Sequence, residues 1–394
     1  MRSNFQCSIS ASQVHGYALQ CLLQAQLLKD HGPKCTASTL WCILLRAAAH
    51  MISVFAACRD LANAPSQQAV FDALCATLPK TLSVLEKRLN NALTGPLPRH
   101  MKRGSWEVAI DLHLVPYYGQ PHKSRNEIYY GQPKQGTAKF HAYATICIVQ
   151  YGQRYTLAIT GVRRHQDLPT VIARLLATVR EKGVKIRRIL LDRAFFNVPV
   201  IELLQRENLP FLMPVMFRGR PPKKRQPKTG LHWIKRQKAG WYKHTLKNGK
   251  REVTISVCVN YRTHKKRKGK HRKVKKRVQQ KLLFGAWRVR GCPTEIREQY
   301  RKRFGIESSY RQLRQAKIQT CTRKPELRLL FVALALIIRN LWVWLHAEKL
   351  SDGRGDRLTL RQERLRFKQM LSWLSHAIVV LLHDGSTPCA IWDP

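Results

Sequence analysis

The chain has 394 residues, of which 71 are Lys or Arg and only 23 are Asp or Glu, so its formal net charge is +48. Charged residues together make up 24% of the chain, an ordinary share, so the anomaly lies in the excess of base over acid. This balance favours a dense polyanion such as nucleic acid as the partner, and the basic residues do not gather on one amphipathic face as membrane-surface binding requires. With 44% apolar residues the chain can build real cores, which excludes a disordered basic tail.

The cysteines and the one long apolar segment bear on the compartment. Eleven cysteines are scattered without CxxC spacing, which indicates reduced thiols in the cytoplasm and argues against a zinc site. The first residues lack the apolar region of a secretory signal. Residues 327–345 approach the length of a membrane-spanning helix but include Arg328, Arg339 and Asn340. Because a central arginine is costly in a bilayer, we expect a buried core helix and no membrane partner.

The first 98 residues predict an all-helical domain. Residues 10–95 show no strand pattern, and Ser66 follows Pro65 as the expected N-cap of one helix. A second helix is expected over residues 77–89. Two short helices with a tight joint resemble a helix-turn-helix, which would make residues 1–98 a DNA-binding domain. An ordinary helical bundle explains the pattern equally well, since a diagnostic glycine is lacking.

From Trp106 the pattern changes to strands. Apolar runs are expected to form strands over residues 106–115, 138–150 and 155–162. Asp167 is then expected to cap a helix, which is followed by a strand that ends at Asp192, a second helix and the strand 211–217. The order βββαβαβ predicts an α/β fold with a mixed sheet and helices on its faces.

Residues 218–290 are strongly basic. Residues 264–277 hold ten Lys or Arg in fourteen positions, which predicts a mobile loop, and the strand-like pieces beside it predict a small β insertion that carries this loop. The expected DNA-binding residues of the loop are Lys265, Lys266, Arg267, Lys268, Arg272, Lys273, Lys275 and Lys276. A solvated tip without a partner is the alternative, although such dense like charge is hard to explain without an anionic ligand. We expect residues 351–394 to form a C-terminal helical region.

Three carboxylates lie where a metal-dependent nuclease needs them. Asp111 and Asp192 each interrupt or end an apolar strand, and Glu307 lies in a helical segment. A lone charge in a buried strand is unfavourable unless it is paired or holds a cation. Cleavage of a phosphodiester by two metal ions requires such carboxylates, so we expect all three to be catalytic and to bind two Mg²⁺ or Mn²⁺ ions. Taken singly, each could instead serve an ion pair.

The motifs around these carboxylates resemble those of the DDE transposases of prokaryotic insertion sequences. The resemblance lies in residues 110–119, in residues 190–196 and above all in the box that contains Tyr300, Arg303 and Glu307. It implies an RNase H-like catalytic domain over residues 104–217 and 291–350, with a five-stranded mixed sheet, interrupted by the insertion at 218–290. Asp111 and Asp192 are 81 residues apart, and Asp192 and Glu307 are 115 apart, which leaves room for that insertion.

The resemblance also implies roles for other residues of the box. In the family its tyrosine, arginine and lysine position transposon-end DNA, and the lysine position here is Arg314, with Lys317 one turn further on. We therefore expect Tyr300, Arg303, Arg314 and Lys317 to bind DNA. The implied partners are double-stranded terminal inverted repeats, target DNA and a second copy of the chain when two ends are paired, in the nucleoid of a prokaryotic cytoplasm.

Three other functions remain open from the sequence. A structure-specific nuclease with the same core would cut DNA without joining a 3′ end to a target. A non-catalytic DNA-binding protein derived from a transposase would keep affinity without cleavage. An RNA-binding basic protein would explain the charge but not the aspartates inside apolar strands.

Overall fold

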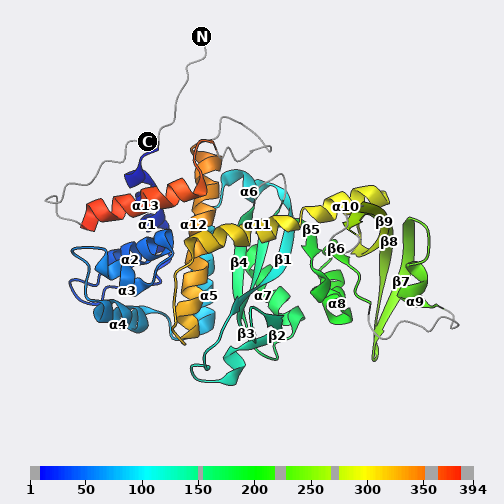
Figure 1. Cartoon of the computed structure of the whole chain (residues 1–394), viewed down its shortest axis with the longest axis horizontal. Helices are drawn as coiled ribbons and strands as arrows, with labels where there is room; N and C mark the ends of the chain where they lie inside the picture. The colour runs from blue at the N-terminus through cyan, green and yellow to red at the C-terminus, as the bar shows by residue number, and fades with distance from the viewer. Residues whose placement is uncertain (1–8, 150–153, 218–227, 268–274, 351–362, 383–394) are drawn as a thin grey trace, which may run out of the picture.

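The computed structural model describes residues 9–149, 154–217, 228–267, 275–350 and 363–382. Within them, helices gather at one end of the molecule, a central sheet follows, and the insertion strands lie at the other end (Figure 1). The strands are β1 Ser105–Pro116, β2 Tyr129–Lys134, β3 Thr137–Ile148, β4 Tyr155–Val162, β5 Lys185–Leu191, β6 Phe211–Pro214, β7 Gly240–Asn248, β8 Arg251–Arg267 and β9 Lys275–Trp287.

These nine described strands form a single sheet. Its order is β2-β3-β1-β5-β6-β9-β8-β7, and β4 pairs with the second half of β3. The pairing of β1 with β3 is antiparallel and that of β1 with β5 is parallel, so the sheet is mixed as expected. The expected count of five strands is too low. The insertion strand β9 pairs with β6 and extends the sheet, and β2 forms between the first two strands that we expected.

Half of the run predicted as a basic loop, residues 264–267 and 275–277, belongs to a β-hairpin. Strands β8 and β9 pair up to Arg267 opposite Lys275, so only residues 268–274 of the loop fall outside the described residues. Antiparallel pairing uses backbone N–H and C=O groups and therefore tolerates a highly charged sequence.

The N-terminal helices are capped by short polar side chains. The helices here are α1 Ala11–Gln24, α2 Ala37–His50, α3 Val54–Arg59 and α4 Gln67–Thr77. Ser10, Thr36, Ser53 and the predicted Ser66 each accept a hydrogen bond from a backbone N–H of the first turn. The C-terminal helix α13 (Phe367–Leu382) packs against α1 and α2, and its buried Ser375 hydroxyl lies 2.6 Å from His50 Nε2. The described part of the C-terminal region therefore joins the N-terminal helices.

Helix α5 (Leu82–Thr94) belongs structurally to the sheet. The sequence left it open whether this helix belongs to a helix-turn-helix or to an ordinary helical bundle. It begins five residues later than predicted and packs chiefly against β4 and α12 (Pro325–Glu348). The free edge of β4 is the reason, because Asn90 of α5 exchanges two hydrogen bonds with the backbone of Ile159, and Asn340 of α12 does the same with Thr156. Side-chain amides thus satisfy an edge that would otherwise be open to another strand.

Helix α12 is the buried core helix that was expected. It is long and apolar enough to cross a membrane, yet 94% of its most apolar window is buried inside the protein. Arg339 is fully buried, where its Nε donates to Gln312 Oε1 at 3.0 Å and its Nη1 donates to the Arg154 carbonyl. The polar residues that argued against a membrane span therefore tie α12 to its neighbours.

The remaining helices connect and cover the sheet strands. They are α6 Arg99–Arg103, α7 Leu168–Glu181, α8 Val198–Arg206, α9 Gly230–Ile234, α10 Pro293–Arg301 and α11 Phe304–Leu313, with short 3-10 turns at Arg125–Glu127, Arg193–Phe195 and Arg314–Ala316. The predicted cap Asp167 begins α7, where it accepts from Thr170 N at 3.1 Å. Helices α10 and α11 follow each other across the middle of the sheet, and α11 packs on β1 (Figure 1).

Candidate active site

Asp111 and Asp192 lie side by side at the same level of two neighbouring strands. In the parallel pairing of β1 with β5, Ile110 stands opposite Leu191, and each aspartate is the next residue of its strand or strand end. Neighbouring parallel strands run in the same direction, so residues that follow a register pair remain neighbours. Asp111 Oδ1 also accepts a hydrogen bond from Leu112 N at 2.8 Å, which fixes the carboxylate beside its own strand.

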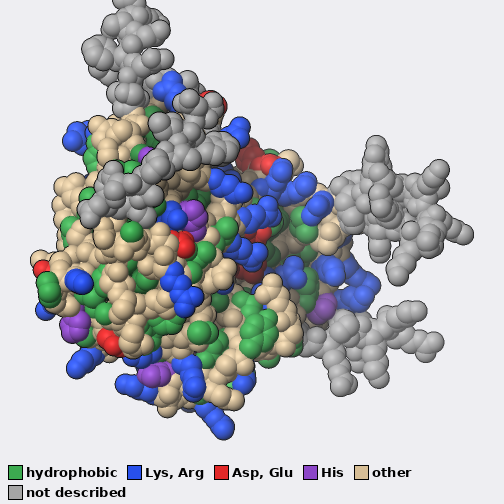
Figure 2. Space-filling model, turned by 60° about the vertical axis from the view of Figure 1, so that its left-hand side comes forward, with side chains coloured by type: hydrophobic (Ala, Val, Ile, Leu, Met, Phe, Trp, Pro, Cys, Tyr) green, Lys and Arg blue, Asp and Glu red, His purple; other side chains and the backbone are tan. Residues whose placement is uncertain are grey.

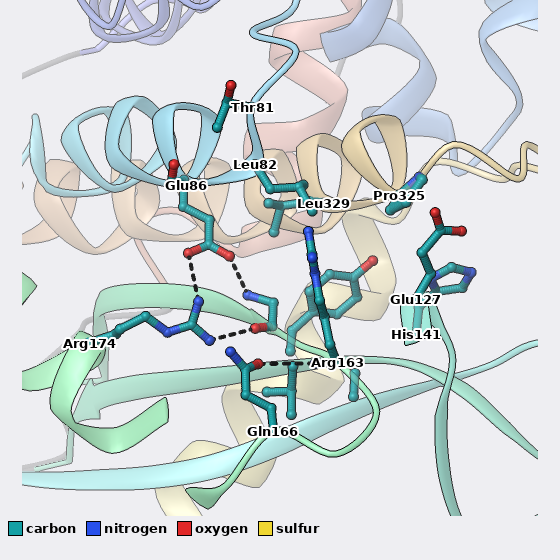
Figure 3. Close-up of a pocket in the computed structure, with 15 residues that line it drawn as sticks. Thr81, Leu82, Glu86, Glu127, His141, Arg163, Gln166, Arg174, Pro325 and Leu329 are labelled. Carbon is teal, nitrogen blue, oxygen red and sulfur yellow. Dashed lines mark hydrogen bonds and ion pairs between the residues drawn. The ribbon is translucent and has the colours of Figure 1, made fainter. Parts of the chain in front are cut away.

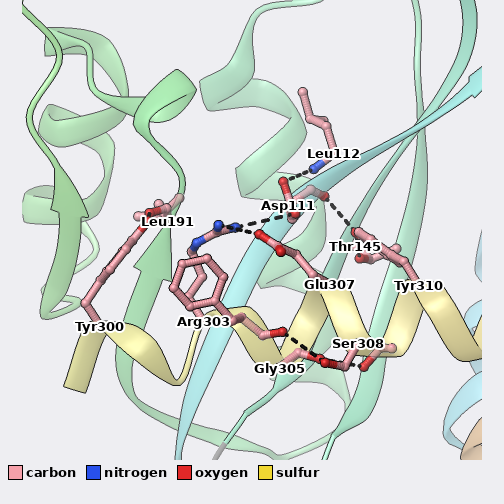
Figure 4. A network of polar contacts seen from close by, with 12 residues as sticks. Asp111, Leu112, Thr145, Leu191, Tyr300, Arg303, Gly305, Glu307, Ser308 and Tyr310 are labelled. Carbon is pink, nitrogen blue, oxygen red and sulfur yellow. Dashed lines mark hydrogen bonds and ion pairs between the residues drawn. The ribbon is translucent and has the colours of Figure 1, made fainter. Parts of the chain in front are cut away.

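Helix α11 brings Glu307 to the same place through Arg303. The guanidinium of Arg303 lies between two carboxylates, with Nη2 at 2.7 Å from Glu307 Oε1 and Nη1 at 3.6 Å from Asp111 Oδ2 (Figure 4). Arg303 begins α11 and Glu307 is one turn later, a spacing that places both side chains on one helix face. Arg303 is 6% exposed, whereas the Glu307 side chain is 42% exposed.

The carboxylate of Asp111 is buried, and the groups around it compensate its negative charge only in part. Burial raises its pKa to about 6, the nearby Arg303 and the Leu112 N–H oppose this shift, and the charges of Asp192 and Glu307 add to it. For Arg303, burial acts to lower the pKa, but Tyr300 and the three carboxylates outweigh it and raise the pKa. All three carboxylates therefore act on one guanidinium, which shows that they share one electrostatic environment.

Arg303 now occupies the position where a cation would be held. Among the described residues no three His, Cys, Asp or Glu side chains are already gathered at metal-binding distances. The buried Nε of Arg303 has no hydrogen-bond partner, so its fit in this place is incomplete. Clustered carboxylate oxygens are the ligands that Mg²⁺ and Mn²⁺ prefer, so the residues fit a divalent metal site once the guanidinium moves away.

A hydroxyl and an imidazole line the site beside Asp111. The Tyr310 hydroxyl lies 2.6 Å from Thr145 Oγ1 and donates to the Asp111 carbonyl at 3.4 Å (Figure 4). The ring of His113 lies 4.8 Å from the Tyr310 ring between centroids. Burial, together with the charges of nearby Lys317 and Arg314, lowers the pKa of His113 to about 4. His113 is therefore neutral at pH 7.

Two of the residues expected to bind DNA are buried instead. Tyr300 is 7% exposed, and its hydroxyl donates to the carbonyl of Leu191, the residue before Asp192, at 3.2 Å. Arg303 forms ion pairs with Asp111 and Glu307. Both side chains face the sheet, where Tyr300 contacts the end of β5 and Arg303 contacts two of the carboxylates. Their expected role in DNA binding stays a prediction.

The other expected DNA-binding residues fall into three groups. Arg314 and Lys317 are exposed and lie close enough to His113 to lower its pKa, which places positive charge at the edge of the site. Lys265, Lys266 and Arg267 lie in β8, and Lys275 and Lys276 lie in β9. Lys268, Arg272 and Lys273 lie outside the described residues. Figure 2 shows one face of the molecule on which Lys and Arg side chains far outnumber acidic ones.

A residue that the sequence interpretation passed over lies on the same strand. Glu107 is 1% exposed and contacts three cationic side chains. Its position four residues before Asp111 in an apolar run was the available signal, because residues an even number apart share a face of a strand.

A cavity elsewhere in the molecule is not part of this site. It has a volume of about 300 Å³ and lies between α5, β3, β4 and α12 (Figure 3). Glu86 and Arg174 pair across it at 3.6 Å, and none of the three candidate carboxylates lines it. The cavity therefore carries none of the chemistry discussed above.

Comparison with known proteins agrees with this geometry. A family model described as "Transposase DDE domain" matches residues 102–341. No curated protein matches the chain. Among solved structures, the chain is similar to a piggyBac transposase synaptic complex with hairpin DNA, determined by cryo-EM, with a TM-score of 0.53, 13% sequence identity and coverage of 96% of this chain and 80% of that one.

At such low identity the structural likeness shows the fold alone. The family match is a separate finding, and its residue range contains Asp111, Asp192 and Glu307. Because that range spans more than half of the chain, this protein belongs to the DDE transposase family.

Proposed function

We propose that this protein cuts DNA at the ends of its own mobile element and joins the resulting 3′-hydroxyl to target DNA, as a transposase of the prokaryotic insertion-sequence type with an RNase H-like catalytic domain. The observation that carries the proposal is that Asp111 and Glu307 share the guanidinium of Arg303, beside Asp192 on the neighbouring strand. Three acidic residues from distant parts of a very basic chain come together at one place, where they would hold metal ions.

Asp111, Asp192 and Glu307 would supply the oxygen ligands for two divalent ions. When bound, these ions would supply activation of the attacking oxygen and stabilisation of the leaving oxygen. The protein's own contribution is placement: the Tyr300 hydroxyl holds the end of β5 next to Asp192, and the Tyr310 hydroxyl holds the backbone of Asp111. Arg303 offsets part of the negative charge of Asp111 and Glu307.

DNA would be bound by the cations around this site. Exposed Arg314 and Lys317 would contact backbone phosphates near the scissile bond, and the basic β8–β9 hairpin would bind DNA further away. We assign recognition of the terminal inverted repeats to the N-terminal helices, and we expect two copies of the chain to pair two ends in the nucleoid of a bacterial or archaeal cytoplasm.

The test is a strand-transfer assay with DNA taken from the flanks of the coding region. Labelled fragments that end in the candidate inverted repeats are incubated with protein, Mg²⁺ and a target plasmid, and products are sequenced. Joined 3′ ends support transposition. Cleavage without joining identifies a structure-specific nuclease, and binding without cleavage identifies a non-catalytic DNA-binding protein.

A further inference from the structure

Glu107 on β1 is one of the most deeply buried acidic residues that the structure describes. Its side chain is 2% exposed, and its oxygens lie 2.6 Å from Lys302 Nζ, 3.4 Å from Arg187 Nη2 and 3.7 Å from Arg188 Nη1. A buried carboxylate is tolerated only with such partners, and breaking one of these pairs is far more costly than a surface ion pair suggests. The three cations therefore make a carboxylate tolerable at this buried position of β1.

A β-bulge brings both arginines to the same carboxylate. Between β1 and β5 the register shifts after Trp106, which is opposite Ile186, so that Glu107 is opposite Arg188 and Arg187 is the extra residue. Consecutive side chains of a regular strand point to opposite faces, and a bulge is the irregularity that re-aims one of them. Without it, only one of the two arginines could reach Glu107.

The third partner connects this cluster to the active site. Lys302 is the C-cap that follows α10, and the next residue, Arg303, is the N-cap that precedes α11 and contacts Asp111. Successive residues of the α10–α11 junction therefore contact two carboxylates of one strand, Lys302 with Glu107 and Arg303 with Asp111. Arg188 also donates to Gln299 of α10, so the cluster holds the junction through two of its residues.

We propose that Glu107 is a positioning residue for the active site, an inference that rests on the proposed function. Glu107 acts through Lys302: by fixing the α10–α11 junction against β1 it sets the distance of Glu307, which is borne one turn into α11, from Asp111. A metal site needs its ligands held to within a fraction of an ångström, and supporting residues outside the ligand shell commonly set metal affinity by 10–100-fold. Glu107 itself is 1% exposed and is not one of the three carboxylates that we propose to hold the metal.

The variants that test this are Glu107→Gln and Lys302→Met, with Lys302→Arg as the conservative variant that keeps the cation. Glu86→Gln is the matched control, because Glu86 also anchors a helix to the sheet, accepting from Gly161 N at 2.8 Å and Thr160 Oγ1 at 2.9 Å beside Arg174 (Figure 3). Four quantities are measured in each variant: Mn²⁺ affinity by electron paramagnetic resonance, amide hydrogen exchange of residues 300–307, and kcat and Kd for an end-containing DNA.

We expect Glu107→Gln and Lys302→Met to weaken Mn²⁺ binding about tenfold or more, to lower kcat in proportion, and to speed exchange at the junction, with DNA Kd unchanged. Lys302→Arg should keep all of these quantities at their wild-type values. Glu86→Gln should leave Mn²⁺ affinity and hydrogen exchange at the α10–α11 junction unchanged. If Glu107→Gln fails to fold, Lys302→Met tests the same contact from its partly exposed side.

Equal losses of stability in Glu107→Gln and Glu86→Gln, with wild-type Mn²⁺ affinity and junction exchange in both, would overturn the inference. That outcome is distinct from failure of the proposed function. If the wild-type protein neither binds Mn²⁺ through Asp111 nor cuts DNA, the proposed function falls, and the positioning role falls with it. If the wild type does both and Glu107→Gln does so equally well, only the inference is wrong.

Discussion

Two carboxylate clusters on one strand differ in how completely their charge is balanced. Glu107 and Asp111 are four residues apart on β1 and share a face. Three cations surround Glu107, and its side chain is 2% exposed. A single cation, Arg303, lies at 3.6 Å from Asp111. The Asp111 side chain is 17% exposed, and burial raises the pKa of its carboxyl group to about 6. The protein thus balances the charge of Glu107 with three cations, whereas the site that we propose to accept a metal is left short of positive charge.

The largest expected contrast is in catalysis. Asp111→Asn, Asp192→Asn and Glu307→Gln should each reduce DNA cleavage by about a thousandfold or more, because each removes a proposed metal ligand and leaves the fold intact. DNA affinity should stay the same or rise slightly, since negative charge is lost near phosphate. Cleavage and gel-shift assays on the same preparations measure both. Parallel loss of DNA binding in these variants would show that the residues are structural.

The two clusters should respond in opposite directions when stability is measured. In metal-free buffer at pH 7.5, Glu107→Gln should lower the free energy of unfolding by about 2–3 kcal/mol, since it strands three cations of which two are partly exposed. Asp111→Asn should raise that free energy, by at most roughly 3 kcal/mol, because it removes a charge that burial disfavours. Urea unfolding of the two variants gives both values. Destabilisation by Asp111→Asn would mean that Arg303 balances its charge fully.

The pH dependence of stability sharpens the same contrast. The pKa of Asp111 is raised from 3.8 to about 6 in the folded state, so between these values the folded protein binds more protons than the unfolded one. Wild-type stability should therefore fall as pH rises through this window relative to Asp111→Asn, by roughly 1.4 kcal/mol per pH unit at most. Burial of His113 acts in the opposite direction in both proteins, so it cancels in the difference. Unfolding curves at several pH values between 4 and 7 test this, and a constant difference would contradict it.

The smallest expected effect concerns the cations at the rim of the Asp111 cluster. Arg314→Ala and Lys317→Ala should each weaken DNA binding a few-fold for all sequences and reduce the slope of log affinity against log salt by about one. Fluorescence anisotropy over a salt series measures that slope. Glu107→Gln serves as the comparison, since we expect no change of slope there. A change in sequence preference in Arg314→Ala would mean that this side chain reads bases.

The carboxylates and the order of strands and helices along the chain could be anticipated, because their signals in the sequence are local. Asp111 interrupts one apolar strand pattern and Asp192 ends another, and Glu307 lies in a spaced motif. The sequence could not show which cations balance the charge of these carboxylates. The Arg303 contact with Asp111 joins residues that are distant in the chain, and the Glu107 cluster depends on a bulge in the β1–β5 pairing, which no periodicity reveals.

Long-range pairing also explains where the fold differs from the one predicted from the sequence. The sheet has more strands than expected because β6 pairs with β9, and that partnership depends on register and not on composition. The apolar positions of helix α5 fit any packed helix, so the sequence could not show that it attaches to β4 through Asn90 and Glu86. Helix α13 docks on α1 and α2 from the other end of the chain.

The central claim is that Asp111, Asp192 and Glu307 bind divalent metal together. Crystals of the protein soaked in Mn²⁺ and measured at an anomalous wavelength test it most directly. We predict anomalous density in contact with oxygens of all three carboxylates, with the Arg303 guanidinium turned away from Asp111. Density at other residues only, or Arg303 still seated between Asp111 and Glu307 at saturating Mn²⁺, would contradict the claim.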